Sequence, residues 1–347
     1  MRVLVALSIT TGVIGVLPVS RGDYDRPVPR AARLDKIQGV TISTHRIGLE
    51  WADDSIEPTL NHITTIGANW VAIHPYAGIS KDGSVSWSRF DPNTYAESVR
   101  RPIREAHERG LKILVKPHLA YWGSGFSWRG EIDFEDPAAR KRFFRDYTRW
   151  TAYMAELSAD ADAFTVGCEL DELVGYETEW RELIAEVRGK TQAPLTYAAN
   201  WPTFEKVPFW DALDAVGIQA YFPLSEKPDP GFDELRDAWA KRMSELRAFS
   251  TRVQRTIVFT ELGYNQSMDA AKMPWDYRVD ATDAAERLQL RCLQVALEAV
   301  DAEPSVSGAF LWKWFPEPYP NGNTFALATA PVKRVICGTW CLPPPYR

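Results

Sequence analysis

The sequence predicts an α/β fold, a closed (β/α)8 TIM barrel in a single domain, and three observations support this prediction. Strand-like runs alternate with helix-favouring runs along the chain, which indicates parallel strands joined by helical crossovers. The strand-like runs are mostly continuous in apolar residues rather than half-polar, as expected for strands that are buried on both faces. No glycine-rich phosphate-binding loop follows any of them, which disfavours an open nucleotide-binding sheet.

The chain contains eight runs with the length and composition of barrel strands. They cover residues 38–44, 69–76, 111–119, 163–170, 195–201, 215–224, 256–264 and 308–314. Amphipathic segments typical of helices lie between most of them, at residues 55–66, 92–109, 137–157, 179–188, 233–249 and 281–300. The link between the fifth and sixth runs is too short to hold a long helix.

The amino-terminal residues are typical of a targeting segment. An arginine at position 2 precedes an uncharged apolar run, and polar sequence with prolines follows. We expect residues 1–22 to be a signal peptide or membrane anchor, residues 23–34 a linker, and residues 35–347 the barrel domain. A secreted or periplasmic location follows, with membrane contact only if the first segment is not cleaved.

Charge and cysteine content exclude some function classes. The formal net charge is −6 and no basic run is present, so we expect no nucleic-acid partner. The histidines and cysteines lack the spacing of a zinc site, and no cofactor or metal is expected. Only Cys337 and Cys341 are close enough in sequence to suggest a local disulfide, which an oxidising compartment would permit.

The carboxyl ends of barrel strands face the catalytic mouth, so the residues there are the candidate site. The polar and aromatic residues at these ends are His118, Glu169, Asn200, Trp201, Tyr221, Glu261, Trp312 and Trp314. Glu169 and Glu261 end the fourth and seventh runs, and neither run contains another acid. Such a pair suits glycoside hydrolysis, because one carboxyl protonates the leaving oxygen while the other attacks the anomeric carbon. The alternative is that each glutamate pairs with a lysine or arginine at the rim.

Six motifs in this order resemble glycoside hydrolase family 113, a group of β-mannanases in the retaining clan A. They are VGCEL, LTYAANW, VGIQAYFPL, FTELGY, PWDY and GAFLWKW, and the resemblance extends over about residues 36–330. It implies hydrolysis of β-1,4-linked mannan or a related β-hexose polysaccharide, with Glu169 as acid/base and Glu261 as nucleophile. Cys168 stands where most of the clan has an asparagine that contacts the sugar 2-hydroxyl, so Asn200 is our candidate for that contact.

Other polar residues near the strand ends have expected roles in binding. Tyr221 is expected to donate its hydroxyl to Glu261, as a tyrosine does in similar clan members, with a rim tyrosine bonded to the backbone as the alternative. His118 is expected to contact a sugar hydroxyl, or else to orient a loop from a buried position. Lys116 points the same way on a regular strand and is a further candidate.

The tryptophans are candidates for stacking on sugar rings. Trp312 and Trp314 share a strand face under simple alternation, so they are expected at the reacting-sugar subsite, with Lys313 facing the helices. Trp201, Trp122 and Trp128 are candidates to extend the groove, with plain packing as the alternative for each.

Two other functions remain open from the residues alone. A sugar-binding barrel without catalysis would keep the aromatic groove, but it would not need both glutamates. A hydrolase of another β-glycan would keep the chemistry, because mannan specificity is implied only by the resemblance. In each case the expected partner is an oligosaccharide or polysaccharide.

Overall fold

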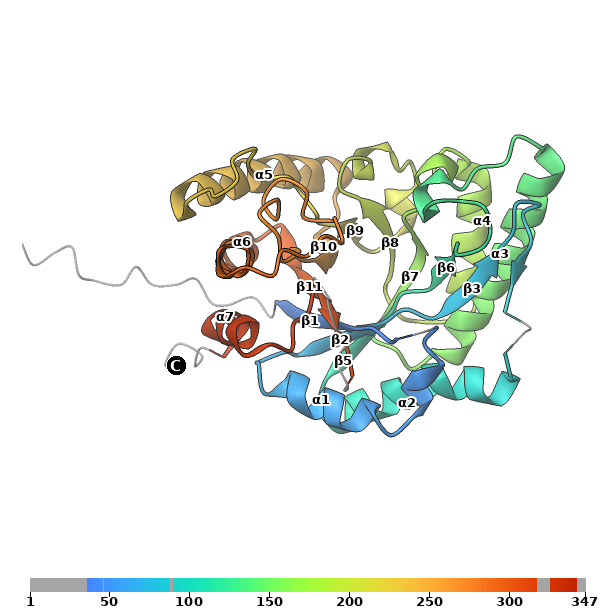
Figure 1. Cartoon of the computed structure of the whole chain (residues 1–347). Helices are drawn as coiled ribbons and strands as arrows, with labels where there is room; N and C mark the ends of the chain where they lie inside the picture. Colours follow the sequence, from blue (N-terminus) through green and yellow to red (C-terminus); the bar gives the residue numbers. More distant parts are fainter. Residues whose placement is uncertain (1–35, 46, 88–89, 317–324, 342–347) are drawn as a thin grey trace, which may run out of the picture. The chain divides into compact units, whose positions relative to one another are not determined.

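The computed structural model describes residues 36–45, 47–87, 90–316 and 325–341, and its centre is a closed parallel barrel of eight strands (Figure 1). Around the barrel the order is β1-β11-β10-β9-β8-β7-β5-β2. The strands are β1 (Ile37–Ile42), β2 (Trp70–Ile73), β5 (Lys112–Val115), β7 (Ala163–Cys168), β8 (Leu195–Asn200), β9 (Val216–Gln219), β10 (Ile257–Leu262) and β11 (Val306–Trp314). The predicted barrel is confirmed, whereas the expected targeting segment 1–22 and linker 23–34 lie outside the described residues.

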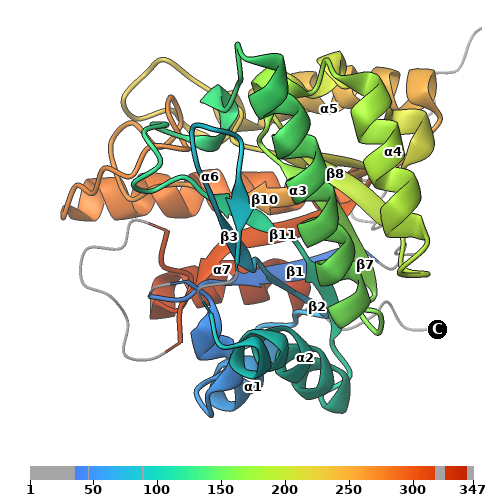
Figure 2. The same ribbon diagram turned by 90° about the vertical axis from the view of Figure 1, so that its right-hand side faces the viewer.

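Helices pack around the outside of the barrel (Figures 1 and 2). They are α1 (Ile56–Thr64), α2 (Pro92–Glu108), α3 (Pro137–Leu157), α4 (Glu177–Arg188), α5 (Phe232–Val253), α6 (Asp283–Ala302) and α7 (Ala330–Trp340). Short 3-10 helices are η1 (Leu49–Ala52), η2 (Arg129–Glu131), η3 (Asp171–Leu173), η4 (Phe204–Lys206) and η5 (Trp210–Ala212). Within the described part of the chain, no helix is both long and apolar enough to cross a membrane.

The helix starts follow from local sequence. α2 and α3 each begin with a proline directly after an aspartate whose carboxylate accepts a hydrogen bond from a first-turn backbone amide. α7 was not predicted, because its short sequence includes Pro331 and Gly338. It packs against α6, and the suggested disulfide between Cys337 and Cys341 is present at its end.

Two prolines shorten the predicted second and third strands. Proline has no backbone N–H to contribute to a β-ladder. Pro75 and Pro117 therefore end the barrel pairing, and the chain continues as β3 (Tyr76–Ile79) and β6 (His118–Ala120). These two strands and β4 (Val85–Ser86) form a separate small sheet in the order β4-β3-β6. The prediction that residues 111–119 form one barrel strand is wrong, and His118 lies in the small sheet.

The barrel interior is filled by side chains of different sizes. Ala72, Leu114, Val258 and Phe310 form one buried cluster drawn from four strands. A Cβ atom on Gly39 would lie 2.4 Å from the ring of Phe310, so this position needs glycine to leave room for the ring. The larger apolar cluster joins the outer faces of the strands to the helices, which leaves the carboxyl end of the barrel for polar residues.

Candidate active site

Three barrel strands carry an extra residue at the carboxyl end. The register shifts between Thr165 and Cys168 on β7, between Phe259 and Glu261 on β10, and between Leu311 and Trp314 on β11. Bulges of this kind redirect the side chains that follow them. Alternation from the inward-facing Val258 would turn Glu261 toward the helices, so the bulge is what returns this glutamate to the interior.

Glu169 follows the bulge of β7 and has a left-handed backbone, with φ of 55°. Its backbone amide donates to the carbonyl of Ala198 at 2.9 Å. Such a conformation costs a non-glycine residue roughly 1–2 kcal/mol, so the surrounding strands hold it in place. The Arg129 guanidinium donates from Nε at 3.1 Å and from Nη2 at 2.7 Å, both to Oε2 of Glu169.

Glu261 is held through both of its carboxylate oxygens and is only 4% exposed. The Lys116 ammonium is hydrogen-bonded to Oε1, and it also donates to the Thr260 carbonyl at 3.2 Å. The Tyr221 hydroxyl donates to Oε2 at 2.6 Å, as expected from the sequence. Burial raises the pKa of Tyr221 well above its ordinary value, and the adjacent carboxylate adds to this effect. The phenol therefore remains a hydrogen-bond donor.

Both glutamates line one cleft of about 520 Å³. Its lining residues are Tyr121, Trp128, Arg129, Glu169, Asn200, Trp201, Pro202, Tyr221, Glu261, Trp275, Asp276, Tyr277, Trp312 and Phe325. Asn200 donates through Nδ2 to both oxygens of Asp171, at 3.1 and 3.0 Å. Trp201 stacks on Trp275 with 5.8 Å between ring centroids. The cleft thus combines two carboxylates with flat aromatic faces, as a sugar-binding site requires.

Some predicted residues do not line this cleft. Lys116 is completely buried beneath it, and His118 is buried with its ring against that of His74. The expectation that Trp312 and Trp314 share a face is wrong, because the bulge in β11 places Trp314 in the core between barrel and helices. Trp122 is exposed beside Tyr121 and Tyr76 and is also absent from the lining.

Lys313 also differs from expectation. Rather than facing the helices, its ammonium lies over the rings of Trp312, Phe315 and Tyr277 at 4.7 to 5.5 Å. Burial lowers the pKa of Lys313 to about 8, although the charge of Glu261 acts in the opposite direction.

Several lining residues were not singled out from the sequence. Arg129 begins η2 in the connection between β6 and α3, where no periodic pattern marks a functional residue. Trp275 and Tyr277 belong to the PWDY motif, which was a usable signal because it contributed to the family resemblance. Trp275 is 42% exposed and Tyr277 is 65% exposed. Both lie far in sequence from any strand end, so reasoning from strand ends did not select them.

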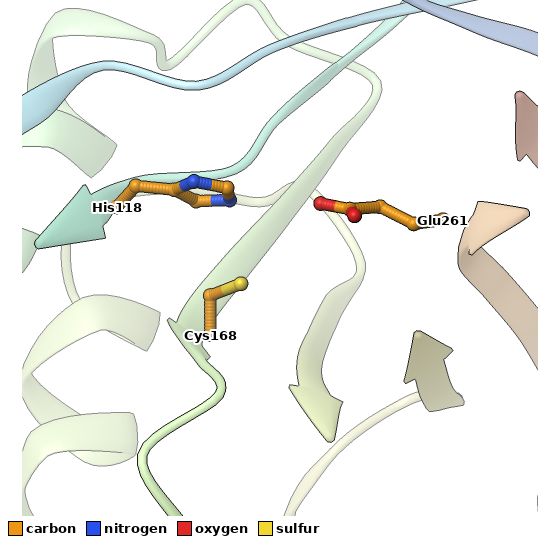
Figure 3. Close-up of side chains that lie close together, drawn as sticks. All are labelled: His118, Cys168 and Glu261. Carbon is orange, nitrogen blue, oxygen red and sulfur yellow. The ribbon is translucent and has the colours of Figure 1, made fainter. Parts of the chain in front are cut away.

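His118, Cys168 and Glu261 come together as a buried cluster (Figure 3). One ligand-type atom from each lies within 4.8 Å of the other two, which is a possible metal-ligand set. The chemistry of these groups does not fit a cation. The Glu261 carboxylate is already bonded to an ammonium and a phenol, and burial raises the pKa of the Cys168 thiol, which therefore stays protonated. Gln219 donates to the Cys168 sulfur at 3.5 Å.

Comparison with known proteins agrees with this geometry. The sequence model of Glycoside Hydrolase Family 113 matches residues 41–326. The GH113 β-mannanase of Alicyclobacillus acidocaldarius, solved in complex with ManMIm, is 26% identical with a TM-score of 0.75, covering 89% of this chain and 98% of that one. A second GH113 β-1,4-mannanase is 21% identical with a TM-score of 0.76, covering 88% and 99%, and is similar in fold. No sequence among the curated proteins matches the chain. The match over most of the chain shows that it belongs to Glycoside Hydrolase Family 113 and is a glycoside hydrolase.

Proposed function

We propose that this protein is a retaining hydrolase of β-1,4-linked mannan, with Glu261 as nucleophile and Glu169 as acid/base. The observation that carries the proposal is that two strand-end glutamates line one aromatic cleft, with Glu261 fixed through both oxygens. Mannan is the favoured substrate because similar GH113 structures are named as β-mannanases.

The reaction then has two steps. In the first, Glu261 attacks C1 of the sugar while Glu169 protonates the leaving oxygen. In the second, water attacks C1, the bond to Glu261 breaks, and Glu169 accepts the water proton. Lys116 and Tyr221 orient Glu261 for attack and stabilise its charge as it leaves. Trp312 and Asn200, both on the cleft wall, are proposed to contact the reacting sugar.

Replacement of the nucleophile tests the residue assignment. Glu261→Ala should lower kcat on mannan by at least about 10⁴-fold, because the covalent route is removed. Azide should then restore cleavage of an activated aryl β-mannoside and yield the mannosyl azide of inverted configuration. Glu172→Ala is the control, since this exposed carboxylate lies after β7, three residues beyond Glu169, and does not line the cleft. Ordinary activity of Glu261→Ala would remove Glu261 from the mechanism.

A polysaccharide panel tests the substrate separately. Reducing ends should appear faster from β-1,4-mannan than from β-glucan or xylan, measured at equal mass concentration. Preference for another polymer would contradict the substrate while leaving the two-step chemistry intact.

We also propose export of the protein. The apolar segment near the amino terminus supports this, and so does the disulfide between Cys337 and Cys341, since such bonds persist in oxidising compartments. Cell fractionation, with the intact mass of the recovered protein, would show whether residues 1–22 are removed. Recovery from the cytoplasm at full length would contradict the proposal.

A further inference from the structure

Arg129 makes a one-sided ion pair with Glu169. Two nitrogens of the guanidinium donate to Oε2, whereas Oε1 has no hydrogen-bond partner among the described residues. The two side chains are 13% and 15% exposed, so solvent screens the pair only partly. The guanidinium also lies over the Tyr121 ring, 5.7 Å from its centroid, which fixes its position on the loop.

This contact fixes the orientation of the Glu169 carboxylate. Two charge-assisted hydrogen bonds to Oε2 hold that oxygen in place and leave Oε1 available. Burial opposes the charge of Arg129, but the Glu169 carboxylate raises the pKa of the guanidinium overall, so this cation persists. Other titratable groups that interact with Glu169 come from several elements, and they are Cys168, Asp171, Tyr221 and Tyr277. None of these four is a cation, so they do not replace Arg129.

We propose that Arg129 is a positioning residue that holds Glu169 by Oε2 and leaves Oε1 free to accept the water proton in the second step of the reaction. The inference rests on the function proposed above. In that step a water oxygen bonds to C1, the bond between C1 and Glu261 breaks with its electrons returning to the carboxylate, and the water proton passes to Oε1 of Glu169. In the first step Glu169 gives a proton to the leaving oxygen, so a substrate whose leaving group needs no proton isolates the contribution of Glu169 to the second step.

The test uses an activated substrate, the 2,4-dinitrophenyl β-glycoside that the wild-type enzyme hydrolyses. Its leaving group needs no proton, so kcat/KM reports attack by Glu261 alone. In Arg129→Met, kcat and KM should fall together by about tenfold or more, with kcat/KM nearly unchanged, because a misplaced Glu169 carboxylate is a poorer base and the glycosyl-enzyme accumulates. Azide should restore kcat, since an anionic nucleophile requires no base.

Two further variants separate this role from a structural one. Arg129→Lys keeps the charge and should retain most of kcat. Arg140→Met removes another arginine that stacks on a tyrosine, 4.5 Å from the Tyr176 ring and outside the cleft, and should change neither constant. A fall in kcat/KM at unchanged KM for Arg129→Met, or no response to azide, would overturn the inference.

Glu169→Ala, measured in parallel, distinguishes failure of the inference from failure of the proposed function. It should show the same pattern on a larger scale, about 10²-fold to 10⁴-fold in kcat. If it does and Arg129→Met does not, only the role of Arg129 fails. If Glu169→Ala leaves kcat unchanged, the acid/base assignment fails, and the inference about Arg129 fails with it.

Discussion

Glu261 and Glu169 are both strand-end glutamates in one cleft, but the molecule holds them in different ways. Glu261 is bonded to Lys116 from the β5 side of the barrel and to Tyr221 after β9, and both partners are buried. Glu169 is bonded through a single oxygen to Arg129, which begins the short helix η2 in the connection between β6 and α3. A nucleophile must be fixed in line with C1, whereas an acid/base must exchange protons with water, and the two neighbourhoods match the roles proposed for Glu261 and Glu169.

Among the variants that test this difference, Lys116→Met should have the largest effect, a loss of unfolding free energy. It leaves Glu261 buried without its cation, and breaking a buried pair from one side costs about 3–5 kcal/mol. Urea unfolding should show this loss, and the double variant Lys116→Met with Glu261→Gln should recover most of it. Lys313→Met is the control, because it removes a nearby cation with no carboxylate contact among the described residues. If Lys116→Met and Arg129→Met lost the same free energy of unfolding, the two glutamates would not differ in how firmly they are held.

The two buried histidines, His74 and His118, should make the folded protein less stable in acid. Burial lowers the pKa of His74 and of His118 well below the ordinary value, and the nearby cation Lys116 acts in the same direction. The unfolded chain binds protons below about pH 6.5 while the folded protein does not, so stability falls as pH falls. The expected slope reaches about 2.7 kcal/mol per pH unit for two histidines in this range.

Urea unfolding of the wild type and of His74→Phe, between pH 7.5 and pH 5, checks this prediction. The variant should lose about half of the extra slope. His62→Phe changes a histidine on the exposed face of α1 and serves as the control. A stability that is flat across this range would contradict neutral, buried imidazoles.

Tyr221→Phe should have the smallest of the three effects. Removing a hydrogen bond to a charged group costs about 1.5–3 kcal/mol, or roughly tenfold to 150-fold in kcat, while Lys116 continues to hold the other oxygen. Steady-state kinetics on mannan measure this loss. Tyr147→Phe, in a buried tyrosine away from the cleft, should leave kcat unchanged. An unaffected kcat in Tyr221→Phe would mean that Lys116 alone is sufficient to position Glu261.

The amino-acid sequence determined the barrel and singled out the two glutamates that line the cleft. Local patterns carry this information, since apolar runs alternate with amphipathic ones and a lone acid ends the runs that became β7 and β10. The same local patterns marked Tyr221, whose hydrogen bond to Glu261 is confirmed.

Only the tertiary structure decided which side chains reach the cleft. The bulges in β7, β10 and β11 change the alternation by one residue, and they are visible only in the pairing with neighbouring strands. This is why Trp312 lines the cleft and Trp314 does not. Arg129 reaches Glu169 across 40 positions of sequence, through a loop whose path depends on packing, so no local pattern specifies the ion pair.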